Sequence, residues 1–122
     1  MQEAVVIVKH YTTEAQMVNP FNLQVIKFHD SAEAELLHLT LDAGESMLLH
    51  IPPVNLLYYI LAGEPMVRVG DEKYYVQPES YVESPAGLAT CVSNPSQTKV
   101  RLLIVKTSKS DEKPIFLTEE NE

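Results

Sequence analysis

The feature of this sequence that most constrains its fold is a series of short apolar runs, each ended within a few residues by Gly, Pro, Asn or Asp. Residues 4–8, 23–28 and 100–105 are rich in β-branched side chains, which favour strands. From Leu37 to Asp42 apolar and polar residues alternate, the period of a strand with one buried face. Many short strands with almost no helix indicate a sandwich or a barrel. The 122 residues suit a single domain.

Three local patterns refine this expectation. Residues 66–69 and 72–76 flank a turn that begins at Gly70, and glycine can supply the positive φ of a tight hairpin. Residues 30–37 start with a helix-capping residue and good helix formers, but we predict strand in their second half. Residues 12–17 are expected to form one short turn.

Some predicted strands have no polar side. Residues 47–49 and 56–61 are apolar in every position, and a strand of that kind is covered on both faces. One face can line a barrel interior, whereas the other must pack on a second sheet or on another subunit. We therefore predict a homodimer in which Leu57, Tyr59 and Leu61, or their alternates on the same strand, are covered.

The formal net charge of -8 excludes several partners. Such a surface repels phosphate groups, so we expect no nucleic acid and no membrane as a partner. No apolar run is long enough for a membrane span, and the N-terminus lacks the basic region of a signal peptide. The expected location is cytoplasmic. The single cysteine, Cys91, excludes an intrachain disulfide and is expected to be a buried structural thiol.

The end of the chain is expected to differ from the rest. We predict one domain over residues 1–107 and an acidic tail over residues 108–122. The tail is either a solvated terminus or an arm that packs Ile115, Phe116 and Leu117 onto a partner subunit.

The spacing of glycine, histidine and proline residues then resembles the cupin superfamily. The first cupin motif is Gly, five residues, His-x-His, three or four residues, Glu, six residues, Gly. Gly44, His50, Pro52, Leu56 and Gly63 keep that spacing.

The second cupin motif is Gly, five residues, Pro-x-Gly, two residues, His, three residues, Asn. Glu79, Pro85, Gly87, Thr90 and Asn94 keep that spacing as well. The resemblance covers most of the domain and implies an all-β, cupin-type antiparallel β-barrel, also described as a double-stranded β-helix or jelly roll.

The same resemblance implies that the family's metal site is degenerate. In cupins the two His and the Glu of the first motif, with the His of the second, bind one divalent metal. Here those positions hold His50, Pro52, Leu56 and Thr90. One imidazole does not hold a transition metal, which needs several convergent N, O or S ligands. We therefore expect no metal ligands and no cofactor.

A barrel without metal can still bind a ligand. Strand alternation predicts an apolar pocket that carries a few polar side-chain groups. Its predicted lining is His50, Leu56, Tyr58, Ile60, Thr90 and Val92. Alternatively, bulky side chains simply fill the barrel. His50 is either a general base or polar anchor, or a remaining barrel histidine bonded to a hydroxyl or carbonyl.

Several functions remain open on the residues alone. The leading one is a metal-free cupin that binds a small organic molecule in the barrel or serves as a dimeric structural module. A second is a metal-independent enzyme of the sugar epimerase or isomerase type, with His50 as base and Tyr58 as acid. Glu83 near His50 could form an acid–base pair. A third is a divalent-metal enzyme with a site rebuilt from His38, His50 and a carboxylate.

Overall fold

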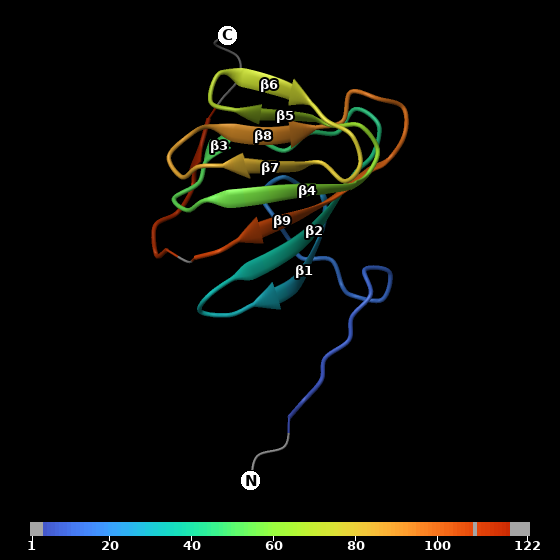
Figure 1. Ribbon diagram of the computed structural model, residues 1–122, viewed down its shortest axis with the longest axis vertical. Coiled ribbons are helices and arrows are strands. Elements are labelled where there is room, and N and C mark those ends of the chain that lie inside the picture. The colour runs from blue at the N-terminus through green and yellow to red at the C-terminus, as the bar shows by residue number, and fades with distance from the viewer. Residues whose placement is uncertain (1–3, 109, 118–122) are drawn as a thin grey trace.

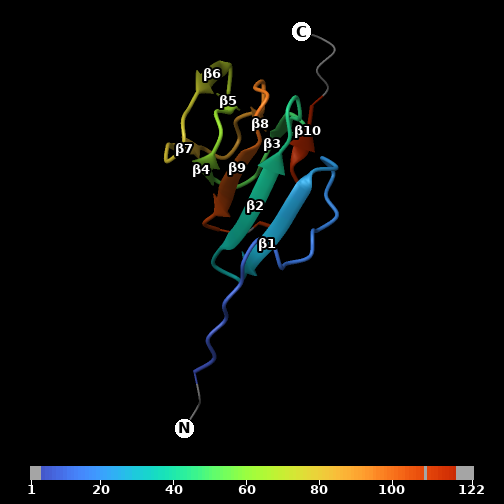
Figure 2. The same cartoon turned by 90° about the vertical axis from the view of Figure 1, so that its right-hand side faces the viewer.

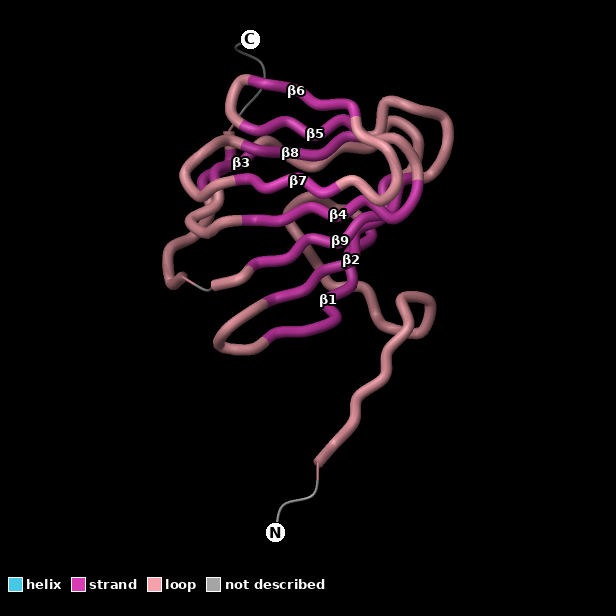
Figure 3. The backbone as a smooth tube through the Cα atoms, viewed as in Figure 1, coloured by secondary structure: helices cyan, strands magenta, loops and turns pink. Residues whose placement is uncertain are grey.

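The computed structural model describes residues 4–108 and 110–117, which form two five-stranded antiparallel sheets and no helix (Figures 1 and 3). The all-β prediction is therefore confirmed. Consequently these residues contain no helix with the length and apolarity that crossing a membrane requires. The first sheet has the strand order β1 (Gln24–Asp30), β2 (Glu35–Leu41), β9 (Val100–Lys106), β4 (Leu56–Ala62) and β7 (Tyr81–Ser84). The second has the order β10 (Ile115–Phe116), β3 (His50–Ile51), β8 (Thr90–Ser93), β5 (Met66–Val69) and β6 (Glu72–Tyr75).

The core lies between the two sheets and follows from strand alternation. In β2 the side chains of Leu37, Leu39 and Leu41 belong to the core, as alternation from Leu37 predicts. In β9 Leu102 and Ile104 point to the same side. The predicted hairpin is confirmed by the pairing of β5 with β6, and the predicted strand after the helix-like segment is β2.

The other face of the first sheet is also largely apolar. Leu57 and Tyr59 of β4 lie opposite Val105 and Leu103 of β9, and Leu36 of β2 is the next neighbour of Val105. Each of these five side chains is half-buried. They form an apolar surface outside the barrel, which we call the outer patch. By contrast, Leu48 was expected to be covered but is 47% exposed, because it lies in the loop before β3.

The N-terminal segment departs from the sequence prediction. We expected residues 4–8 to form a strand, but they pair with no described strand and extend away from the barrel (Figures 1 and 2). Val5, Val6, Ile7 and Val8 are 73–88% exposed. The next residue, Lys9, is anchored by its Nζ atom, which donates to the Phe28 carbonyl at 3.1 Å. Because the segment leaves the body at this point, it forms no strand pairing within the described part of its own chain.

The C-terminal segment belongs to the barrel more than the sequence suggested. Ile115 and Phe116 form β10, which pairs with β3 of the same chain, and the Leu117 amide donates to the Leu49 carbonyl at 2.9 Å. The apolar residues that could have covered a partner subunit thus extend the second sheet of their own chain. Residue 109 and residues 118–122 of the predicted acidic tail lie outside the described residues.

One position of the second cupin motif has a positive φ but carries a residue other than glycine. Glu79, at a place where cupins have glycine, has a φ of 68°. A side chain in this left-handed region costs about 1–2 kcal/mol. We expect Glu79→Gly to raise the free energy of unfolding by about 0.5–1 kcal/mol. Glycine relieves the backbone strain of the folded protein, but it also makes the unfolded chain more flexible, which offsets part of the gain. Urea unfolding measures this gain, and Asn22→Gly, at a φ of 57°, should gain less because asparagine tolerates this region.

Candidate functional site

The centre of the barrel is closed by a hydrogen-bonded tyrosine. The Thr90 hydroxyl donates to the Arg68 carbonyl at 2.8 Å, so the Tyr58 hydroxyl donates to Thr90 Oγ1, at 3.0 Å. Tyr58, Thr90 and the neighbouring Ile60 have no exposed surface. Burial raises the pKa of the Tyr58 phenol well above its ordinary value. The phenol therefore stays protonated and serves as a structural donor.

The side chains predicted to line a pocket are the ones that fill this interior. Leu56 and Val92 are also at most 2% exposed. Strand alternation correctly placed these residues on the inner face. Of the two alternatives drawn from the sequence, the geometry matches a barrel filled by its bulky side chains.

His50 lies at one end of this interior, beneath two aromatic rings. Its ring centroid is 5.3 Å from that of Phe21 and 5.7 Å from that of Phe116. Its Nδ1 atom lies 2.9 Å from the Leu48 carbonyl and must donate to it, because a carbonyl only accepts. Burial lowers the pKa of His50, the bond to Leu48 opposes this shift, and the charge of Lys106 adds to it. The neutral imidazole thus has the bonded, buried character of a structural histidine.

The donor set at this position does not fit a metal. Of the mapped cupin positions, Pro52 and Leu56 carry no donor and the Thr90 hydroxyl is already bonded to Tyr58 and Arg68. Across residues 4–108 and 110–117, no three His, Cys, Asp or Glu side chains are grouped so that they could hold a metal ion. The rebuilt site suggested for His38 and His50 is not formed.

His38 instead faces the outer side of the first sheet. Its ring stacks on Tyr11 with centroids 4.7 Å apart, and Arg101 Nε donates to its Nε2 atom at 3.2 Å. The neutral ring then carries its proton on Nδ1, which is buried without a partner in the described part of the chain. Burial, and next the charge of Arg101, lower the pKa of His38. Sequence reasoning missed this cluster because Tyr11 is distant in sequence and covers His38 only in the folded chain.

Glu83 also points outward and corrects the proposed acid–base pair. It lies opposite Leu57 on the outer face and is exposed, and it accepts a hydrogen bond from the Tyr81 hydroxyl at 2.6 Å. The inward position of β7 is Ser84, opposite Leu56. The Ser84 hydroxyl is buried and has no hydrogen-bond partner in the described residues. Glu83 therefore cannot assist His50.

Comparison with known proteins gives a family and a fold. The family model "Cupin domain" matches residues 37–106. A solved structure from Thermus thermophilus is 28% identical, covers 84% of this chain and 98% of its own, and has a TM-score of 0.73. An RmlC-like cupin from Shewanella frigidimarina is 16% identical, with 91% and 97% of the two chains covered and a TM-score of 0.75. The polyketide cyclase RemF from Streptomyces resistomycificus is 15% identical, with 96% and 89% covered and a TM-score of 0.80. No curated protein matches the chain.

Proposed function

The chain belongs to the cupin domain family, and we propose that within this family it acts as a homodimeric module without a metal in its barrel. The observation that carries this proposal is the filled interior. Tyr58 occupies the centre of the barrel, bonded to Thr90, where a metal or substrate would need open space and free donors. The protein would then use the barrel as a rigid scaffold and act through its outer surfaces.

The geometry gives less support to a metal-independent epimerase. Such an enzyme needs an accessible base and an acid with a pKa near its working range. Tyr58 has a raised pKa and no exposed surface, and its hydroxyl bonds to Thr90. Likeness to a polyketide cyclase at 15% identity concerns the fold alone.

The metal-free character is tested with protein purified without a histidine tag. We expect well below one equivalent of zinc, iron, manganese or nickel in elemental analysis. Adding each metal should leave the melting temperature unchanged, because we expect no binding. A metal that did bind the native state, present at about 100 times its Kd, would stabilise the protein by about 2.7 kcal/mol and raise the melting temperature. His50→Ala serves as the comparison and should give the same result. One metal per chain in the native protein, lost in His50→Ala, would place the protein among the metalloenzymes.

Two apolar surfaces of the described chain support a dimer. The outer patch is half-buried, with no second layer above it among residues 4–108 and 110–117, and residues 5–8 form an exposed β-branched run. A run of this kind gains stability when it pairs with a strand or covers an apolar face. In a two-fold dimer the outer patches face one another, and the N-terminal segment of each subunit lies on its partner. A second copy of this chain is therefore the occupant we propose.

Assembly is tested by placing a charge in the outer patch. Tyr59→Arg should convert the dimer to a folded monomer, since an unpaired charge buried at an interface costs several kcal/mol whereas a half-exposed arginine is tolerated in the monomer. Tyr75→Arg is the matched control, because Tyr75 of β6 is 76% exposed and lies in the other sheet. Sedimentation should show the native protein and the control as dimers. A native monomer at micromolar concentration, or a dimeric Tyr59→Arg, would contradict the proposed interface.

A further inference from the structure

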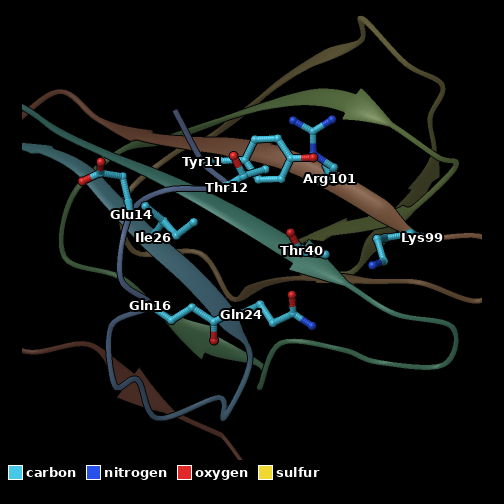
Figure 4. A pocket seen from close by; sticks show the side chains of 9 residues that line it. All are labelled: Tyr11, Thr12, Glu14, Gln16, Gln24, Ile26, Thr40, Lys99 and Arg101. Atoms are coloured by element: carbon cyan, nitrogen blue, oxygen red, sulfur yellow. The ribbon is translucent and has the colours of Figure 1, made fainter. Parts of the chain in front are cut away.

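A polar pocket of about 320 Å³ lies on the outer face of the first sheet, on the side opposite the filled barrel. Figure 4 shows its side chains, which come from three adjacent strands and from the N-terminal segment. Gln24, Thr40 and Arg101 form one cross-strand row, since Gln24 pairs with Thr40 and Thr40 pairs with Arg101. Tyr11 and Gln16 line the pocket from the N-terminal segment.

Arg101 is held in this pocket without a counterion. Its guanidinium carbon lies 4.1 Å from the centre of the Tyr11 ring, and its Nε atom donates to His38. No carboxylate of residues 4–108 or 110–117 forms an ion pair with it. Four other cations do form ion pairs with Asp or Glu, namely Lys27, Arg68, Lys99 and Lys106. In a chain of net charge -8, a fixed and unpaired guanidinium at a pocket indicates an anionic ligand.

The remaining charges around the pocket favour a ligand with a single negative charge over one with two. Lys99 forms an exposed ion pair with Asp42, whose Oδ1 atom lies 3.7 Å from the lysine Nζ atom, and this pair offsets part of its charge. Glu14 also lines the pocket, without an ion pair to Arg101, so it would repel a doubly charged phosphate more strongly than a monocarboxylate. A planar guanidinium matches a carboxylate, and the amide and hydroxyl groups of Gln16, Gln24 and Thr40 match hydroxyl groups.

We propose that this pocket binds a small hydroxylated monocarboxylate, with Arg101 holding the carboxylate and the neighbouring polar side chains holding its hydroxyl groups. The Tyr11 ring and His38 orient Arg101, so the N-terminal segment completes the site. The cavity is separated from the barrel interior by the sheet itself. The site therefore does not depend on the metal-free barrel, although it lies on the same face of the first sheet as the outer patch.

Gluconate is the probe. Glucose is a comparison that lacks the carboxylate, and inorganic phosphate is a comparison that lacks the carbon chain. Titration of the full chain, followed by amide NMR shifts, should show gluconate binding that perturbs Thr40 and Arg101. Glucose should bind more weakly because it cannot pair with the guanidinium. Phosphate should also bind more weakly, since Glu14 repels its second charge. Arg101→Gln should weaken gluconate binding by at least about tenfold, the loss expected for a charge-assisted bond.

Two further variants make the result decisive. Arg68→Gln removes an arginine of the second sheet and should leave gluconate binding unchanged. Thr40→Val removes a hydroxyl of the pocket while keeping Arg101, and should weaken gluconate binding even if Arg101→Gln fails to fold. The proposal is overturned if gluconate does not bind at about 10 mM, if Arg68→Gln weakens it as much as Arg101→Gln, or if phosphate binds more tightly than gluconate.

Discussion

Gly63→Ala is expected to lower the free energy of unfolding by about 2–5 kcal/mol. Gly63 has a φ of 85°, where a side chain costs about 1–2 kcal/mol. A Cβ atom at this position would also lie 2.6 Å from the Lys99 carbonyl oxygen and 2.8 Å from Val100 Cγ2. These atoms belong to the start of β9 and its preceding residue, so the clash pushes β9 away from β4 in the middle of the first sheet, with an overpacking cost of about 1–3 kcal/mol.

Gly44→Ala separates the two causes. Gly44 has a similar φ of 81°, but a Cβ atom there would meet nothing within 4 Å. Its replacement should therefore cost only the backbone term of about 1–2 kcal/mol. Urea unfolding of the two variants at equal protein concentration measures the difference. Equal losses at the two positions would show that the close approach of β9 to Gly63 contributes nothing.

The positions that sequence reasoning identified are those fixed by local rules. Alternation determines which residues of a strand share a face, so the inner positions of β2 and β4 could be read directly. Turn geometry favours glycine where φ is positive, which explains why the spacing of Gly44, Gly63 and Gly87 pointed to the barrel. Whether these inner side chains line a pocket or fill the barrel could not be predicted from alternation, which gives the face of each residue but not the space between the two sheets.

The features that sequence reasoning missed depend on contacts between distant parts of the chain. His50 is enclosed by Phe21 and Phe116, which come from opposite ends of the sequence. His38 is buried in part because Tyr11 crosses the outer face of the first sheet and stacks on its ring. Likewise the strand predicted at residues 4–8 is wrong, because β-branched residues favour a strand only where a neighbouring strand pairs with them, and these residues pair with none in the described part of the chain. Periodicity carries no information on these long-range partners.

Acidification from about pH 7 to about pH 5 is expected to reduce stability through the two buried histidines. In the folded protein burial lowers the pKa of both His38 and His50, whereas in the unfolded chain each imidazole titrates near 6.5. Below that value the unfolded chain therefore binds more protons than the folded protein. The stabilisation is fully present above the unfolded pKa and is lost as the pH falls below it, by up to about 1.4 kcal/mol per pH unit for each proton bound only by the unfolded chain.

His38→Gln and His50→Gln test this assignment, because glutamine can still form a hydrogen bond but does not titrate. Each single variant should reduce the slope of unfolding free energy against pH, and the double variant should remove most of it between about pH 5 and about pH 7. Glu35, whose pKa is lowered by its bonds to Lys27 and Lys106 despite its burial, loses its stabilising charge only at lower pH, so its contribution falls outside this window. Urea unfolding at fixed protein concentration across the pH series provides the measurement. A double variant with the same slope as the native protein would show that both buried imidazoles are protonated without cost, and would refute the neutral state on which the Arg101–His38 bond depends.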